Sequence, residues 1–153
     1  MKEIIDAWHI HNRINLYLLD AIDEKYLGAV PVTSKGRNVG EQFAHMHNVR
    51  LMWLKVASPA LFEEQTKIEK ENPITKKLLA KQLEQSGNAI VKLLEKGFTE
   101  GKIKGFKPSP AAFYSYLVSH ESHHRGQVTI ALKQSGHKLD PKVLYGMWEW
   151  GSR

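Results

Sequence analysis

The stretch 109–136, SPAAFYSYLVSHESHHRGQVTIALKQSG, decides the fold that the sequence predicts. It opens with Ser109 and Pro110, which suit a helix cap and first turn, and it closes at Gly136, a typical helix end. At about 100° per residue, four of its apolar side chains share one face. Those side chains are Phe113, Leu117, Val128 and Ala131. The stretch therefore predicts one long amphipathic helix.

Three further helical patterns precede it, over 2–27, 38–57 and 72–98. Asn38 with Glu41 three residues later resembles a capping box, and Asn72 before Pro73 resembles another helix start. A short last helix is expected after Asp140, and no segment alternates like a strand. We predict a single all-α domain, 1–153, built as an up-down-down-up four-helix bundle with a longer crossover after its second helix and a short C-terminal helix.

Composition limits the classes of function. No apolar run approaches the roughly 20 residues that cross a bilayer, and the charged N-terminus has no signal-peptide pattern, so we expect a cytoplasmic protein with no membrane partner. Its 22 Lys and Arg residues give a net charge of +6 but are scattered, which argues against nucleic acid. The absence of cysteine excludes disulfides and thiolate metal ligands.

Histidines interrupt the apolar face of the last long helix. His120, His124 and Gln127 fall on that face, and burying two imidazoles without partners would cost several kcal/mol. Because rings at i and i+4 can reach one ion, a metal site is one interpretation, and a hydrogen-bonded polar cluster is the other. The second helix offers His45 and His47, each about 100° from its apolar direction on opposite sides, so the wheel does not choose a third ligand.

Other polar and aromatic residues stand out. His11 and Asn15 fall in the apolar stripe of the first helix, where they would line the same cavity, bond a ligating ring or pair with each other. Trp148 and Trp150 are expected to cover one end of the bundle or a neighbouring subunit.

The pattern H-E-x-x-H at 120–124 is that of zinc peptidases, in which the Glu is the general base. Here Glu121 lies about 100° from His120 on the wheel, at the flank of the stripe. The extended peptidase pattern also fails, because Gln127 and Ile130 stand at its Gly and last His positions. We therefore disfavour a peptidase.

Three segments together resemble the DinB/YfiT-like family of four-helix-bundle metalloproteins. They are HESHHRGQ at 120–127, VGEQFAHMHNVRLMWL at 39–54 and MWEWG at 147–151. The resemblance implies a His triad, with His120 and His124 from the last long helix. It favours His45 over His47 as the third ligand, because the family's histidine follows a G-E-x-x-x-H stretch.

The resemblance also implies a chemistry. Three neutral imidazoles leave open positions on a divalent metal, with zinc or nickel most suitable and iron or manganese also compatible. Some family members resemble transferases that use a low-molecular-weight thiol, so a small thiol and an electrophile are the expected partners, in detoxification or a stress response. Gln127, Arg125 and Glu121 are the candidate catalytic residues. Dimerisation is common in the family, so a homodimer is a further expectation from the resemblance. The alternative is a non-catalytic metal-binding or structural bundle that acts as a stress-response or binding module.

Overall fold

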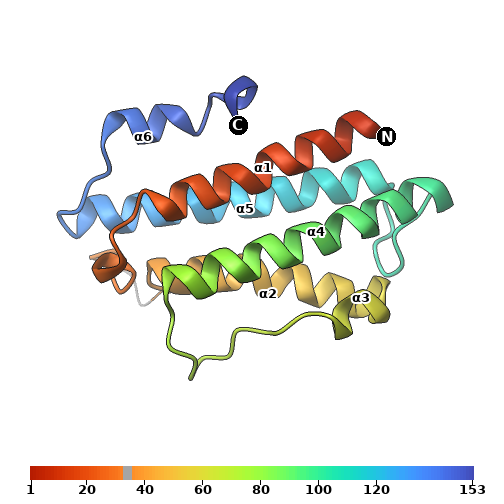
Figure 1. Ribbon diagram of the computed structural model, residues 1–153, viewed down its shortest axis with the longest axis horizontal. Coiled ribbons are helices and arrows are strands. Elements are labelled where there is room, and N and C mark those ends of the chain that lie inside the picture. Colours follow the sequence, from red (N-terminus) through yellow and green to blue (C-terminus); the bar gives the residue numbers. More distant parts are fainter. Residues whose placement is uncertain (33–35) are drawn as a thin grey trace.

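A computed structural model describes residues 1–32 and 36–153 and confirms the all-α bundle (Figure 1). Its four long helices are α1 (Lys2–Asp20), α2 (Val39–Ala57), α4 (Lys76–Glu100) and α5 (Pro110–Gln134). Helices α2 and α4 run in one direction while α1 and α5 run in the other, so the up-down-down-up order is also confirmed. The parallel α2 and α4 are joined by the expected crossover, which contains α3 (Pro59–Glu63).

Local capping explains where two of the long helices begin. The Asn38 side chain accepts a hydrogen bond from the Glu41 backbone N–H, and Glu41 accepts one from the Asn38 N–H, both at 2.8 Å. This is the predicted capping box. Ser109 caps α5 by accepting a bond from the Ala112 N–H, at 3.3 Å. Gly136 follows α5 with a φ of +80°, a left-handed conformation that glycine adopts without strain.

Two predicted boundaries were wrong. Helix α1 ends at Asp20 rather than near Leu27, because Asp23 accepts a bond from the Lys25 N–H and starts the 3-10 helix η1 (Glu24–Tyr26). The resulting turn buries both Ile22 and Leu27. Helix α4 begins at Lys76 with Thr75 as its cap, whereas Asn72 instead accepts the Glu69 N–H at 2.7 Å and closes a turn in the crossover.

The C-terminal segment also differs from its prediction. The last helix was predicted over 142–150, whereas α6 (Pro141–Gly146) ends earlier and is followed by η2 (Trp150–Ser152). This segment folds back along α1 and α5 and does not cover an end of the bundle (Figure 1). Arg153 anchors it, since its guanidinium lies 3.9 Å from the centre of the Tyr17 ring and its carbonyl accepts a bond from Arg13.

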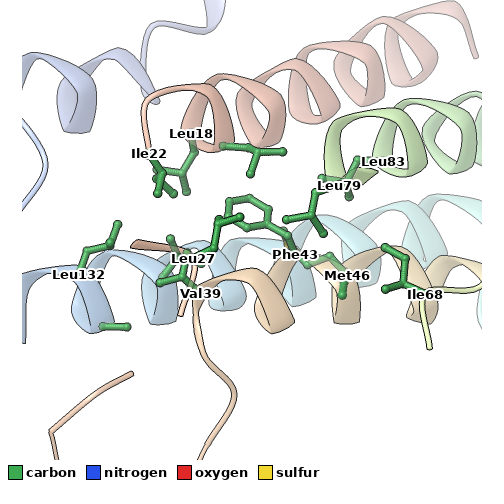
Figure 2. Close-up of a cluster of buried hydrophobic side chains, with 14 residues drawn as sticks. Leu18, Ile22, Leu27, Val39, Phe43, Met46, Ile68, Leu79, Leu83 and Leu132 are labelled. Atoms are coloured by element: carbon green, nitrogen blue, oxygen red, sulfur yellow. The ribbon is translucent and has the colours of Figure 1, made fainter. Parts of the chain in front are cut away.

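The core is divided into two apolar clusters along the bundle axis. Figure 2 shows the first, where Phe43 and Met46 of α2 face Leu18, Leu79 and Leu132 of the other long helices. The second surrounds Trp8 and Phe113 nearer the other end. Between them each long helix contributes buried polar side chains: His11 and Asn15, Arg50, Ser86, and Glu121. Among the described residues, no helix is both long and apolar enough to cross a membrane.

Candidate metal centre

Three histidines from two helices converge beside the polar layer. His45 of α2 faces His120 and His124 of α5, with ring centres 5.2 and 4.6 Å away. Each ring offers one nitrogen, and these three atoms lie within 4.8 Å of one another. The Nε2 atoms of His120 and His124 are 3.1 Å apart. Since zinc–nitrogen bonds are about 2.0–2.1 Å, two nitrogens on one ion would lie roughly 3 Å apart, so the pair could hold a metal ion.

The site lies at the edge of the bundle. His45 and His120 are half-buried and His124 is buried, whereas histidines on the apolar face of the helix predicted a site in the bundle core. The reason is that helices α2 and α5 pack directly against each other, and the facing flanks of both helices carry the rings. A half-exposed site is open to a ligand from solvent, which a fully buried one would not be.

His47, the other histidine that the helical wheel left open, lies away from the pair on α5. Its ring is fully buried, and its Nε2 lies 2.9 Å from the Thr66 carbonyl in the crossover. His45 and His47 therefore face opposite neighbours of α2, the first α5 and the second the crossover. Only His45 joins the pair on α5.

Gln42 orients one of the rings, and the sequence analysis missed it. Its Oε1 lies 2.7 Å from His124 Nδ1, while its Nε2 donates a longer bond to the Arg37 carbonyl at 3.5 Å. The amide therefore presents its oxygen to the ring, and His124 Nδ1 carries the proton. His124 Nε2 is then left with a lone pair directed at His120, which is the form that binds a metal. Gln127, a candidate catalytic residue, is half-buried, and its side chain makes no hydrogen bond among the described residues, so the ring is oriented by Gln42 instead.

The surroundings keep the rings neutral. Burial lowers the pKa of His45 to about 4, and the positive charge of Arg37 contributes to the same shift. Burial likewise lowers the pKa of His124 to about 4 and lowers the pKa of His120. All three imidazoles are therefore unprotonated near pH 7, which metal coordination requires.

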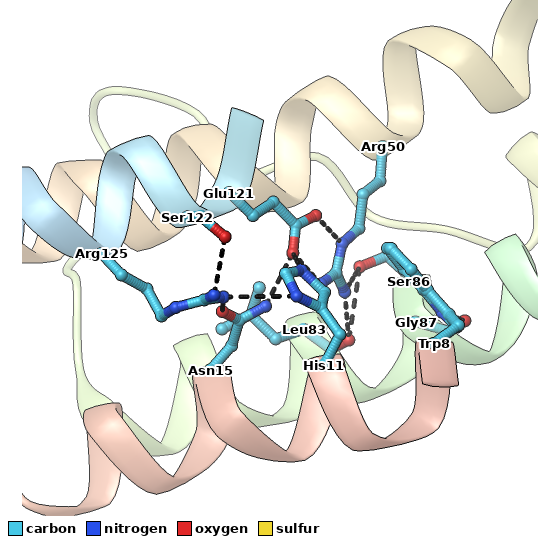
Figure 3. A network of polar contacts seen from close by, with 10 residues as sticks. All are labelled: Trp8, His11, Asn15, Arg50, Leu83, Ser86, Gly87, Glu121, Ser122 and Arg125. Carbon is cyan, nitrogen blue, oxygen red and sulfur yellow. Dashed lines mark hydrogen bonds and ion pairs between the residues drawn. The ribbon is translucent and has the colours of Figure 1, made fainter. Parts of the chain in front are cut away.

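Glu121 is buried inside the bundle, where it belongs to a network of polar contacts (Figure 3). Arg50 Nε and Nη2 each donate to one of its carboxylate oxygens at 2.7 Å, and both side chains are completely buried. His11 and Asn15 bond the same carboxylate, at 2.8 and 2.6 Å. Burial by itself would raise the pKa of Glu121, but the charge and hydrogen bonds of Arg50 lower it well below its usual range. The carboxylate is thus a fully used acceptor and lacks the position of a peptidase base.

Arg125 extends this network outward. It donates to Asn15 Oδ1 at 2.6 Å and to Ser122 at 2.8 Å, and it lies 3.4 Å from His11 Nδ1. His11 Nδ1 therefore accepts, and its Nε2 donates to Glu121. The structure joins Glu121 and Arg125 in one polar network between α1, α2 and α5, separate from the three facing histidines. The sequence analysis did not single out Arg50. Its position was readable, because Arg50 follows Phe43 by seven residues and so shares the inward face of the helix.

The fold and this site agree with a comparison against known families. A sequence model described as the DinB family matches residues 1–150. The chain belongs to the DinB family. Its resemblance to DinB/YfiT-like proteins is thus confirmed, and its His cluster is compatible with metal binding.

One curated DinB-like relative of this chain is the uncharacterized protein YrdA of Bacillus subtilis (strain 168). The two are 21% identical over 159 residues, an alignment that covers 95% of this chain and 88% of YrdA. The alignment therefore extends over nearly the whole bundle. YrdA is uncharacterized, so no activity can be carried over from it to this chain.

Proposed function

We propose that the protein is a metal-dependent enzyme that transfers a low-molecular-weight thiol to an electrophile. The observation that carries the proposal is the convergence of His45, His120 and His124 on one point of a half-exposed surface. Neutral imidazoles suit zinc and nickel, and iron or manganese would also be accepted. The absence of cysteine is consistent with a nucleophile that arrives with a cosubstrate.

The residues of the chain have separate roles in this proposal. The three histidines hold one divalent ion, which would supply Lewis-acid chemistry by lowering the pKa of a thiol so that it reacts as a thiolate at neutral pH. Gln42 fixes the tautomer of His124. Tyr116 stacks on His120 with ring centres 6.1 Å apart and shields that ring. In the reaction a sulfur–carbon bond forms, the leaving group departs with its electron pair, and the thiol proton passes to solvent.

Metal analysis is the first experiment. The purified protein, reconstituted separately with zinc, nickel, iron and manganese, is expected to retain one ion per chain, and His124→Ala is expected to retain none. Metal-loaded protein is then screened with small thiols against a bimane electrophile. The absence of turnover with every thiol would remove the transferase proposal and leave the metal site.

A second candidate is a non-catalytic bundle that serves as a binding or stress-response module. It is favoured by the network around Arg50 and Glu121, which satisfies the central polar layer without any ion. Failure to retain any of the four metals after reconstitution would favour this candidate over the enzyme.

A further inference from the structure

A cavity of about 530 Å³ opens beside the histidine cluster. Its walls are the residues just before α2, the first half of α2 and the crossover segment 67–74. His45 belongs both to this wall and to the cluster, so the cavity adjoins the proposed metal site. The volume falls within the range of about 300–1,000 Å³ that is usual for small-molecule sites.

Cations are in excess on the wall of this cavity. Arg37, Lys67 and Lys70 line it together with two carboxylates, Glu41 and Glu69. Both carboxylates are already engaged: Glu41 accepts the Asn38 N–H and Glu69 pairs with Lys67, each at 2.8 Å. Across residues 1–32 and 36–153, Arg37 and Lys70 have no carboxylate within 4.0 Å. Two positively charged groups are thus available to a ligand.

Arg37 is close to the histidines as well as to the cavity. It lines the cavity together with His45. Burial is the main cause of the lowered pKa of His45, His120 and His124, and the charge of Arg37 adds to it alongside the neighbouring histidines. Its carbonyl also accepts the bond from Gln42, the residue that orients His124. The guanidinium is exposed and so keeps its donors for a partner.

A bound divalent ion would make this region more positive. The three imidazoles are neutral ligands and add no negative charge, and the nearby Glu121 carboxylate is already balanced by Arg50. A site of this charge attracts anions, and the planar fork of an arginine pairs well with carboxylate and phosphate groups.

We propose that this cavity binds a carboxylate or phosphate group of the substrate thiol, with Arg37 as its main contact and Lys70 as a second. The inference rests on the proposed function and narrows its substrate class to small anionic thiols. The sulfur would lie toward His45, and the anionic group would lie in the cavity. Arg37 is then a specificity-determining residue.

The test compares thiols that share one carbon chain and differ in charge. Binding of 3-mercaptopropionate, 2-mercaptoethyl phosphate, 2-mercaptoethanol and cysteamine to zinc-loaded protein is measured by isothermal titration calorimetry. We expect the better of the two anions to bind roughly tenfold more tightly than 2-mercaptoethanol, and cysteamine to bind most weakly. Which anion binds better distinguishes a carboxylate from a phosphate site.

Variants test whether the preference for anionic thiols comes from the cavity. Arg37→Gln should abolish the preference for anions without changing the affinity for 2-mercaptoethanol, and Arg37→Lys should restore part of it. Lys107→Gln removes one charge from the loop between α4 and α5, at the opposite end of the bundle from the Arg37 loop, and should keep the preference (Figure 1). Equal affinities for charged and neutral thiols, or equal losses in Arg37→Gln and Lys107→Gln, would overturn the proposal.

A second arm separates this inference from the proposed function. Propionate and ethyl phosphate, which carry no thiol, are titrated into metal-free and zinc-loaded protein while backbone amide signals are followed by nuclear magnetic resonance. Saturable shifts at Arg37, Ile68 and Lys70 that vanish in Arg37→Gln would support the anion site even if no thiol reacted. Shifts spread evenly over the surface, or unchanged in Arg37→Gln, would contradict it.

Discussion

Gln42 determines which nitrogen of His124 faces the candidate metal site. Its two hydrogen bonds, to the ring and to the Arg37 carbonyl, fix both the amide and the tautomer. The sequence around Gln42 does not indicate this role, because its partner His124 lies 82 positions away. The neighbours of a ligand ring are visible only when the helices are docked.

Replacing Gln42 should weaken metal binding without unfolding the bundle. We expect Gln42→Leu to lower zinc affinity by about 10–100-fold, because His124 loses the acceptor that holds its Nδ1 proton. Competition with a chromophoric chelator measures the effect. Gln42→Glu serves as the matched control, since it keeps an acceptor and should keep most of the affinity; an unchanged affinity in Gln42→Leu would contradict the orienting role.

The ligand assignment itself is tested by thermal unfolding. An ion that binds only the folded state adds about 2.7 kcal/mol when its free concentration is a hundredfold above Kd, and so raises the melting temperature. His124→Ala should lose that increment. His137→Ala should keep it, because His137 stacks on Tyr26 away from the cluster, with ring centres 3.6 Å apart. Equal losses in both variants would rule out the assignment.

At the scale of the elements, α5 serves two sites with adjacent residues. His120 faces α2 at the edge of the bundle, and the next residue, Glu121, faces the interior. The 100° step of a helix separates them, so one turn provides both a candidate ligand and a buried carboxylate. The H-E-x-x-H pattern therefore combines two unrelated features: the histidines of the candidate metal site and the glutamate of the buried polar network.

The Arg50–Glu121 pair joins α2 to α5, and breaking it should be costly. We expect Arg50→Met to lower the free energy of unfolding by about 3–5 kcal/mol, because an unpaired carboxylate remains buried. The double variant Arg50→Met, Glu121→Leu should be more stable than Arg50→Met alone, since no charge is then left without a partner. Urea denaturation of the metal-free variants measures both, and a double variant less stable than either single one would refute this account.

Across the whole molecule, burial of neutral histidines makes stability depend on pH. Burial lowers the pKa of His47 to about 4 and also lowers the pKa of His11. The unfolded chain, with histidine pKa values near 6.5, therefore binds more protons than the folded protein below that pH. The stabilisation is complete above about pH 6.5 and is lost as the pH falls toward 4.

Urea denaturation of the metal-free protein between pH 7.5 and 4.5 tests this expectation. The free energy of unfolding should decrease steadily over that range. His47→Gln keeps a donor for the Thr66 carbonyl but cannot be protonated, so its curve should be flatter than that of the wild type. Parallel curves would show that His47 contributes nothing to the pH dependence.

The sequence by itself determined the helices, because helix formation depends on neighbours three and four residues away. Asn38 with Glu41, and Ser109 with Pro110, marked two starts correctly, and apolar spacing marked the inward faces. The predicted helix boundaries were wrong at 21–27 and at 72–75. Asp23 and Thr75 are the caps in the structure, but other residues nearby gave equally plausible helix-end and helix-start signals.

Only the tertiary structure decided which polar residues meet. His45 and His47 lie at equal angles from the apolar face of α2. They have different partners because α5 packs on one side of α2 and the crossover packs on the other. Arg50 and Glu121 lie 71 positions apart, and Arg37 lines the same cavity as His45 together with residues of the distant crossover. Such pairings depend on how the helices rotate and dock, which local spacing along the chain does not contain.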